Sequence, residues 1–403
     1  MRHPLRAAAL AVAALLALPA AAQTNDTAPF YAGASLGVTQ VSNVYRLSTG
    51  SNSDRVTSAG LLAGVDTRLG RQHLTFDGSL QDNRYADNRA LNNRSYSLKG
   101  ALEWQTVGNL SGTLSALSTQ SLAQFNLGSG TQPYFEKNTE RNEDYTAVVR
   151  LGMGTRYSLE ASASRRERNF SNAVYDQFTY RQNAGSFGIY AMPGGNVRLG
   201  LVARRTDGTY PRYPVYLFGF RVGSLALDYK RDDLDFTTAW NAGGSSTLNT
   251  RISTSRTNYD PASAGQRNFR GTTGAIGWNW QATSKVLLNL QYTRDSGQET
   301  LAQTADVNRV YTTWQLNSRY ALTGKVSLNA GAIRSRSHGT SDSAASAVES
   351  FDNNNTYNVG VQWAFSRSVS LGCQYNRANR ESNITQYAFS ASSYGCTGQM
   401  LVY

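Results

Sequence analysis

Long hydrophobic runs are nearly absent from this 403-residue sequence. Outside a short stretch near the N-terminus, nothing approaches the roughly 18 consecutive apolar residues of a membrane-spanning helix. Hydrophobic residues make up only 40% of the chain even with tyrosine included, and the mean hydropathy is −0.44. A soluble domain of this length normally contains more apolar sequence to fill its core. These shortages argue against a helical membrane protein and against one large soluble fold.

Histidine and cysteine are also scarce. Beyond the N-terminal segment the only histidines are His73 and His338, which lie far apart, and neither has an arrangement of Ser and acidic residues distinctive of a catalytic triad. No Cys/His cluster has metal-ligand spacing, and no Gly-rich stretch resembles a nucleotide loop. We therefore expect no enzyme activity, metal or cofactor. The formal net charge is +12, but the arginines are dispersed singly along the chain. Nucleic acid is therefore not an expected partner.

The N-terminus has the three parts of an export signal. A basic start is followed by an apolar run over residues 7–18 and then by Pro19-Ala20-Ala21-Ala22. This order predicts a cleaved signal peptide at residues 1–22 and a mature chain of residues 23–403 that forms a single domain.

Residues 55–85 show the pattern that recurs through the rest of the chain. Apolar and polar residues alternate with period two along two segments, which a short turn at Leu69-Gly70 joins. On the first segment Thr57, Leu61 and Val65 share one face. Successive side chains of a strand point to opposite faces, so each segment is expected to be a strand with one apolar face.

Similar segments follow to the end of the chain, separated in turn by tight turns and long polar loops. The longest loop is expected at residues 208–223, which are rich in proline and aromatics. Short turns on one side and long loops on the other are typical of bacterial outer-membrane barrels. We predict an all-β, transmembrane, antiparallel up-and-down barrel of about eighteen strands, or of sixteen, with both termini in the periplasm. A soluble β-sandwich or β-solenoid is the alternative fold.

Aromatic residues sort by strand end, as they do in the two girdles of membrane barrels. We expect one girdle on the tight-turn side and one on the loop side. The tight-turn side is predicted to hold Trp104, Tyr190, Trp240, Trp280, Tyr320 and Trp363, and the loop side Tyr85, Tyr96, Tyr229, Tyr259, Tyr292 and Tyr375.

The opposite face of the strands is expected to line a polar lumen. Its predicted charged residues are Lys99, Arg150, Arg156, Arg166, Arg198, Arg204, Arg251, Glu103 and Glu160. The neighbouring arginines among them predict an electropositive side that favours anions. The alternative is a mixed-charge wall that only hydrates and braces the barrel.

Cys373 and Cys396 fall opposite each other if the last hairpin is centred between Ile384 and Thr385. Facing Cβ atoms of an antiparallel pair lie about 4.5–5.5 Å apart, near the spacing of a disulfide. An exported chain would keep such a bond, so we expect a structural bridge, with free thiols as the alternative.

Several stretches resemble a known family. They are NVYRLSTG at residues 43–50, the run SDRVTSAG…RLGRQHLTFDGSLQDNRY at 53–85, LSGTLSALSTQSL at 110–122, and the two cysteine environments LGCQYNRANRESN and YGCTGQ. The chain is similar to the β-barrel porins encoded in exopolysaccharide biosynthesis operons (the EpsL type). That resemblance implies a Gram-negative outer-membrane channel in export or assembly of a surface polysaccharide.

Two other functions stay open at this point: a general small-solute porin, and an outer-membrane enzyme or surface receptor that uses the barrel as a scaffold. The expected partners are outer-membrane lipid, lipopolysaccharide, the barrel assembly machinery, polysaccharide and periplasmic export components.

Overall fold

The computed structural model describes residues 29–125, 135–152, 154–217, 220–260, 268–296, 309–340 and 349–403. The predicted signal peptide at residues 1–22 lies outside these ranges. Among the described residues no helix has the length and hydrophobicity to cross a bilayer. The regular structure is almost entirely β.

In the described residues eighteen antiparallel strands form one sheet, with three short 3₁₀ turns between them. The strands are β1 (Phe30–Val41), β2 (Asp54–Leu69), β3 (Gln72–Tyr85), β4 (Asn93–Gln105), β5 (Leu110–Leu122), β6 (Thr139–Leu151), β7 (Tyr157–Phe170), β8 (Tyr180–Gly194), β9 (Val197–Leu217), β10 (Phe220–Asn241), β11 (Ser246–Asp260), β12 (Phe269–Gln281), β13 (Val286–Ser296), β14 (Arg309–Ala321), β15 (Val326–Thr340), β16 (Glu349–Ala364), β17 (Val369–Ser382) and β18 (Phe389–Val402). The 3₁₀ turns are η1 (Arg89–Leu91), η2 (Ala173–Phe178) and η5 (Thr385–Tyr387).

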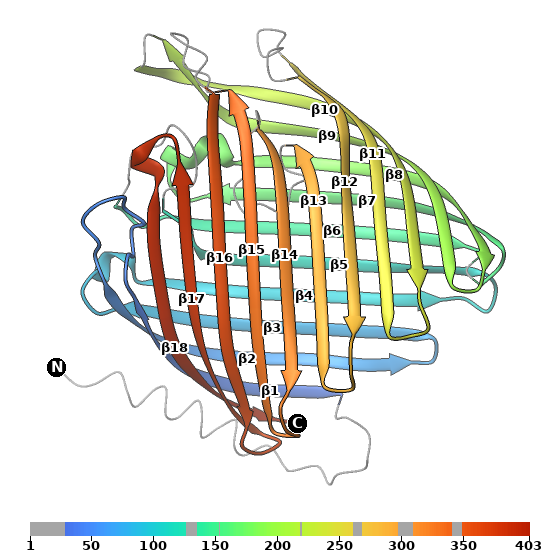
Figure 1. Cartoon of the computed structure of the whole chain (residues 1–403), viewed down its shortest axis with the longest axis horizontal. Coiled ribbons are helices and arrows are strands. Elements are labelled where there is room, and N and C mark those ends of the chain that lie inside the picture. The colour runs from blue at the N-terminus through green and yellow to red at the C-terminus, as the bar shows by residue number, and fades with distance from the viewer. Residues whose placement is uncertain are drawn as a thin grey trace.

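Each strand pairs with its sequence neighbours, and β1 pairs with β18 to close the barrel (Figure 1). The first tight turn is Gly70-Arg71, one residue later than the sequence indicated, and Gly70 has φ +64°. Such a positive φ favours glycine in a two-residue hairpin. The start of β1 and the end of β18 both lie at the tight-turn end.

One loop prediction was wrong. Residues 208–217 and 220–223 continue β9 and β10, which become the longest strands of the barrel at 21 and 22 residues. Beyond Thr209, β9 pairs with β10 alone, so this hairpin projects past its neighbours with register shifts near Gly223 and Leu227. The prolines that pointed to a loop are accepted because this part of β9 has one unpaired edge.

The strand registers divide the wall into two faces. Leu36 on β1, Leu61 on β2 and Leu80 on β3 point outward and are 68%, 47% and 55% exposed. Such large apolar side chains would be costly in water around the whole barrel, whereas lipid solvates them. The inward face instead contains serine, threonine, amides and charged residues, so the barrel encloses a polar lumen.

Candidate functional site: the lumen and its mouth

The outward belt contains most of the predicted girdle aromatics. On the tight-turn side these are Trp104, Trp240, Trp280, Tyr320 and Trp363, and on the loop side Tyr96, Tyr292 and Tyr375. Trp240, Tyr320 and Trp363 are each about two-fifths exposed, as expected of rings that face lipid.

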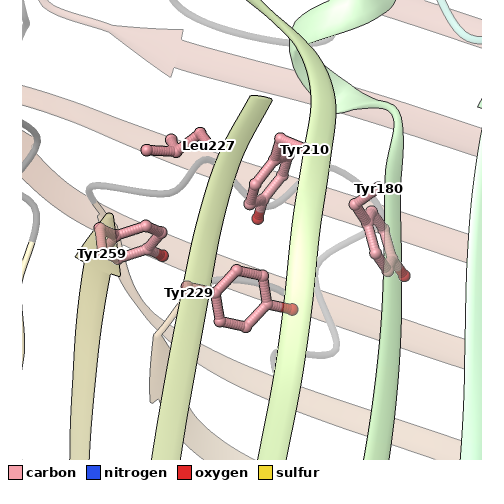
Figure 2. Close-up of a cluster of buried hydrophobic side chains, with 5 residues drawn as sticks. All are labelled: Tyr180, Tyr210, Leu227, Tyr229 and Tyr259. Atoms are coloured by element: carbon pink, nitrogen blue, oxygen red, sulfur yellow. The ribbon is translucent and has the colours of Figure 1, made fainter. Parts of the chain in front are cut away.

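Four predicted girdle residues point inward instead. Tyr190 is 9% exposed, and its ring lies under the Arg198 guanidinium at 3.6 Å. Tyr85 packs beneath the loops of the mouth. Tyr229 and Tyr259 belong to a buried cluster with Tyr180, Tyr210 and Leu227, which come from the loop-side parts of β8 to β11 (Figure 2). The Tyr229 hydroxyl donates to Gln182 Oε1 at 2.7 Å. Position near a strand end could not separate these rings from the outward ones, because alternate residues of a strand face opposite sides of the wall.

The predicted lumen residues lie on the inner wall, with one exception. Lys99, Arg150, Arg166, Arg198, Arg204, Arg251, Glu103 and Glu160 all occupy inward positions of their strands. Arg156 lies in the exposed turn between β6 and β7, over the ring of Tyr157, and does not line the wall.

Carboxylates match the inward cations in number. On the wall strands, leaving out the projecting hairpin, the described inward bases are Arg68, Lys99, Arg150, Arg166, Arg168, Arg198, Arg204, Arg231, Arg251, Arg319 and Arg380. The inward acids are Asp54, Asp66, Asp77, Glu103, Glu140, Asp144, Glu160, Asp233, Asp235, Asp295 and Asp352. The two sets are equal over the whole described wall, although inward bases outnumber inward acids on β6 to β9, the side where the arginines predicted positive charge.

The first charged group holds two cations on one carboxylate. Arg150 Nε lies 2.9 Å and Arg198 Nη2 3.2 Å from Glu160 Oε2. Arg150 also donates to Thr113 Oγ1 at 3.1 Å. This patch has a local excess of one positive charge on the wall formed by β6, β7 and β9.

The second group is larger and neutral: it pairs Arg204, Arg231 and Arg251 with the buried carboxylates of Asp233, Asp235 and Asp295. Arg231 donates to both Asp233 oxygens at 3.0 Å, and its Nη2 lies 2.8 Å from Asp295 Oδ1. Arg251 Nη2 lies 3.0 Å from Asp295 Oδ2, and Arg204 Nη2 lies 3.0 Å from Asp233 Oδ2. Asp295 is fully buried, so this network braces β9 to β13 from inside.

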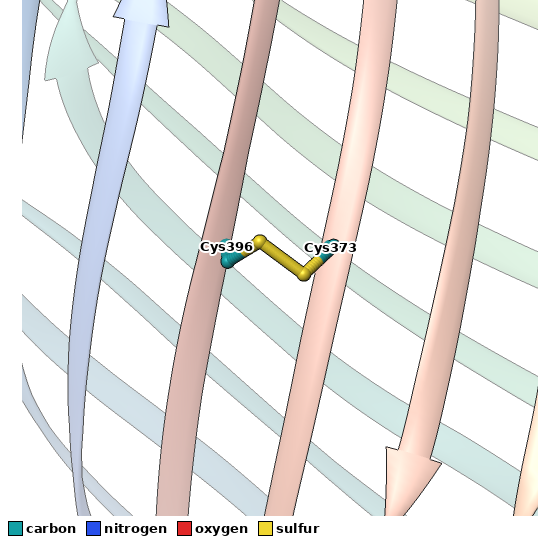
Figure 3. The surroundings of a disulfide bond; sticks show 2 residues. All are labelled: Cys373 and Cys396. Atoms are coloured by element: carbon teal, nitrogen blue, oxygen red, sulfur yellow. A yellow bond between two sulfur atoms is a disulfide. The ribbon is translucent and has the colours of Figure 1, made fainter.

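The disulfide lies on the lipid side of the wall. Cys373 on β17 and Cys396 on β18 stand directly opposite each other with a Cα–Cα distance of 4.0 Å, and their sulfurs are bonded (Figure 3). Cys373 is two residues from Tyr375 and Cys396 is four residues from Met400, so both cysteines face outward as those residues do. The bond therefore ties the last two strands together beside the closing β1–β18 seam and adds nothing to the lumen.

Sequence analysis did not foresee the pocket at the loop-side mouth. The mouth loop (residues 42–53, between β1 and β2) and residues 123–125 after β5 enclose a cavity of about 520 Å³ against the inner wall of β14 to β18. Its polar lining includes Arg46, Asn354, Asn376 and Arg380, and its aromatic lining includes Tyr85, Phe125 and Phe389. The volume is within the range of small-molecule sites.

Hydrogen bonds and packing hold the mouth loop in place. Asn43 is buried and donates to the carbonyls of Leu47 and Ser390 at 2.8 and 3.1 Å, so it ties the loop to β18. Val44 packs with Leu91 and Phe125 in a buried cluster. At the other end of the loop, Asp54 accepts the backbone N–H of Asn88 at 2.8 Å. These contacts fix the conformation of the mouth loop against the barrel.

Arg46 is placed over the pocket by an unusual backbone. It is the only non-glycine residue with positive φ (+53°) in the described part of the chain. Its guanidinium lies 5.1 Å from the centroid of Phe389. Burial disfavours the charged form and so lowers the pKa of Arg46. Strained residues of this kind concentrate at functional sites, which makes Arg46 a candidate contact for a solute.

No group of three or more His, Cys, Asp or Glu side chains could hold a metal ion within the described ranges. His73 bonds Asp66 at 2.7 Å near the tight-turn end, where it joins the polar wall.

A closed antiparallel barrel with a lipid-facing apolar belt, outward aromatic rings and a polar lumen is the architecture of outer-membrane β-barrels. No protein-family model matches the chain, and no curated protein matches it.

Solved structures with a similar fold include three outer-membrane proteins. OpdK from Pseudomonas aeruginosa is 10% identical, with a TM-score of 0.45 over 93% of this chain and 99% of that one. OccK2 (OpdF) of the same species, in complex with glucuronate, is 11% identical, with a TM-score of 0.47 over 93% and 98%. OccAB3 of Acinetobacter baumannii is 10% identical, with a TM-score of 0.46 over 93% and 100%. Similarity this distant assigns no substrate to the present chain.

Proposed function

We propose that this chain is an outer-membrane channel through which small hydrophilic, sugar-like solutes cross, with its long loops outside and the described chain ends facing the periplasm. The observation that supports this best is the mouth pocket, which combines aromatic rings with amides and arginine. Amide groups donate and accept hydrogen bonds, as sugar hydroxyls require. Few, well-placed polar groups among apolar ones are typical of small-molecule sites.

The lumen wall below the pocket also presents amide side chains, like the pocket lining. Inward amides continue along β13 to β17 as Asn289, Gln291, Asn317, Asn329, Asn358, Gln362 and Gln374. Because the wall charges balance, neither anions nor cations should be held strongly. A solute that hydrogen-bonds weakly at many positions can move through such a channel without being trapped.

Liposome swelling tests the proposal. Purified, refolded protein in liposomes should admit monosaccharides and disaccharides faster than larger oligosaccharides. An Arg46→Gln, Asn354→Ala variant should change sugar uptake more than uptake of a small ion. The matched control is Arg156→Gln, which removes a charge from a turn outside the pocket. Liposomes that stay impermeable to all sugars although the protein is folded would refute the channel.

Export or assembly of a surface exopolysaccharide is the second candidate. It is favoured by where the resemblance to the exopolysaccharide-operon porins falls, since residues 43–50 include Asn43, Val44 and Arg46 of the pocket lining. In this case the barrel assembly machinery would insert the chain, and periplasmic export components would deliver the polymer to the tight-turn end.

A host deletion separates the two candidates. Loss of surface polysaccharide, or its retention in the periplasm, would favour export. Unchanged polysaccharide together with slower uptake of small sugars would favour the small-solute channel.

A further inference from the structure

The outward face of the barrel differs between its two sides just above the apolar belt. From β3 to β10, outward arginines have carboxylate partners on the same face. Arg84 lies 2.7 Å from Asp82, and Arg181 lies 3.5 Å from Glu167. Arg205 lies 3.4 Å from Asp232. On this side the surface charge is neutralised within the protein.

From β12 to β15 the outward face is purely basic. Among the described outward positions of these strands there is no carboxylate, whereas Arg270, Arg294, Arg334 and Arg336 are exposed. No ion pair joins any of these four to an acid of the described chain. We call these four residues the basic patch.

The registers place three members of the basic patch close together, and Arg270 lies four residues along β12 from Gly274, which faces Arg294. Arg294 and Arg336 both stand opposite Thr312, one on each side of β14. Two strand spacings separate them, or about 10 Å. Arg334 is two residues from Arg336 on the same face of β15. Positive charge is thus concentrated where like charges repel unless an anion lies between them.

A further cation, Arg256 of β11, borders the patch. It stands directly opposite Arg270. Outward carboxylates stand two strands away from the patch on both sides: Asp232 lies opposite Arg256 and bonds Arg205, and Glu381 lies beyond Asn353 from Arg336. The pairing of two arginines across strands is unfavourable by itself, which again indicates an external counter-charge.

The height of the patch indicates what that counter-charge is. Trp314 stands opposite both Tyr292 and Arg334, and the Tyr292 and Trp314 rings lie 4.6 Å apart. These rings face lipid at the loop-side interface, where amphipathic aromatics meet headgroups. Lipid phosphates occupy this level, and arginine binds phosphate through paired N–H donors.

We propose that the basic patch is a binding site for a phosphorylated lipid headgroup of the outer leaflet, with the chemistry of the diphosphorylated glucosamine lipid of lipopolysaccharide. This inference rests on the outer-membrane placement in the proposed function but not on what passes through the lumen. The site anchors one side of the barrel, β12 to β15, to the outer leaflet. The opposite side, with its internal ion pairs, makes no comparable contact.

The test uses purified, folded barrel in detergent with added diphosphorylated lipid A. The native chain should bind it and unfold at a higher temperature. A variant with Arg270, Arg294, Arg334 and Arg336 all changed to Gln should bind more weakly, by roughly fivefold for each charge removed. A control variant with Arg84, Arg141, Arg165 and Arg181 changed to Gln alters net charge equally. This control should keep native-like binding.

Two further ligands in the same assay test whether the lipid phosphates are what binds. Dephosphorylated lipid A should not stabilise the native chain, and inorganic phosphate at the same concentration should not reproduce the effect of the lipid. Equal loss of lipid binding in the two variants, or stabilisation by free phosphate alone, would overturn the proposal. Both variants should keep sugar permeation in liposomes, so failure of this site is distinguishable from failure of the channel.

Discussion

Adjacent residues on β2 give the sharpest test of which face meets lipid. Leu61 points outward and is 47% exposed, while Leu62 points into the lumen. Leu61 lies midway along the apolar part of β2, between Thr57 and Val65. An arginine at position 61 would have to place its charge in hydrocarbon, whereas an arginine at 62 would find water and polar neighbours.

Leu61→Arg should therefore lower the free energy of unfolding by about 2–4 kcal/mol, the cost found for arginine near the midplane of membrane barrels. That equals a shift of about 30- to 1,000-fold in the folding equilibrium. Leu62→Arg should cost far less. Reversible unfolding by guanidinium in phospholipid vesicles measures both, with Leu61→Ala and Leu62→Ala as controls for lost packing. Equal penalties for the two arginines would refute the assignment of faces.

Three further predictions concern the wall. Non-reducing peptide mapping of protein extracted from membranes should find Cys373 linked to Cys396; alkylation of both without prior reduction would contradict this. Asp295→Ala removes the carboxylate that Arg231 and Arg251 share and leaves the buried network with one uncompensated positive charge, so it should destabilise the barrel by about 3–5 kcal/mol in the same unfolding assay; a change below 1 kcal/mol would show that the network does not brace the wall. Arg150→Gln with Arg198→Gln exposes the Glu160 carboxylate and should move the reversal potential in a salt gradient toward cation preference; an unchanged potential would place this group away from the ion path.

Period-two alternation predicted the strands, because the wall has lipid on one face and water on the other, and the alternation of tight turns with long loops and the aromatic positions predicted the barrel. Leu61 shows the rule plainly, since it was placed on the apolar face of its strand with Val65 and it points outward. The same rule failed at the β9–β10 hairpin. There prolines sit on a strand edge that no neighbour needs for pairing, so sequence that is typical of a loop stays extended.

The site was harder to predict because it depends on contacts between segments that are distant in the sequence. Tyr190 and Tyr229 were assigned to the girdles from their positions near strand ends, but both serve the inner wall through Arg198 and Gln182. The mouth pocket joins residues 42–53 to β14–β18, and no local pattern contains that contact. The charge balance of the lumen likewise appears only when each arginine is matched with acids on neighbouring strands.

Single-channel recording in planar bilayers tests the central claim, a hydrated and charge-balanced lumen that admits sugars. The native protein should give discrete conductance steps, a reversal potential near zero in a salt gradient, and brief current reductions when a small saccharide is added on the loop side. Folded protein that gives no conductance steps, or that conducts one sign of ion almost exclusively, would contradict the account.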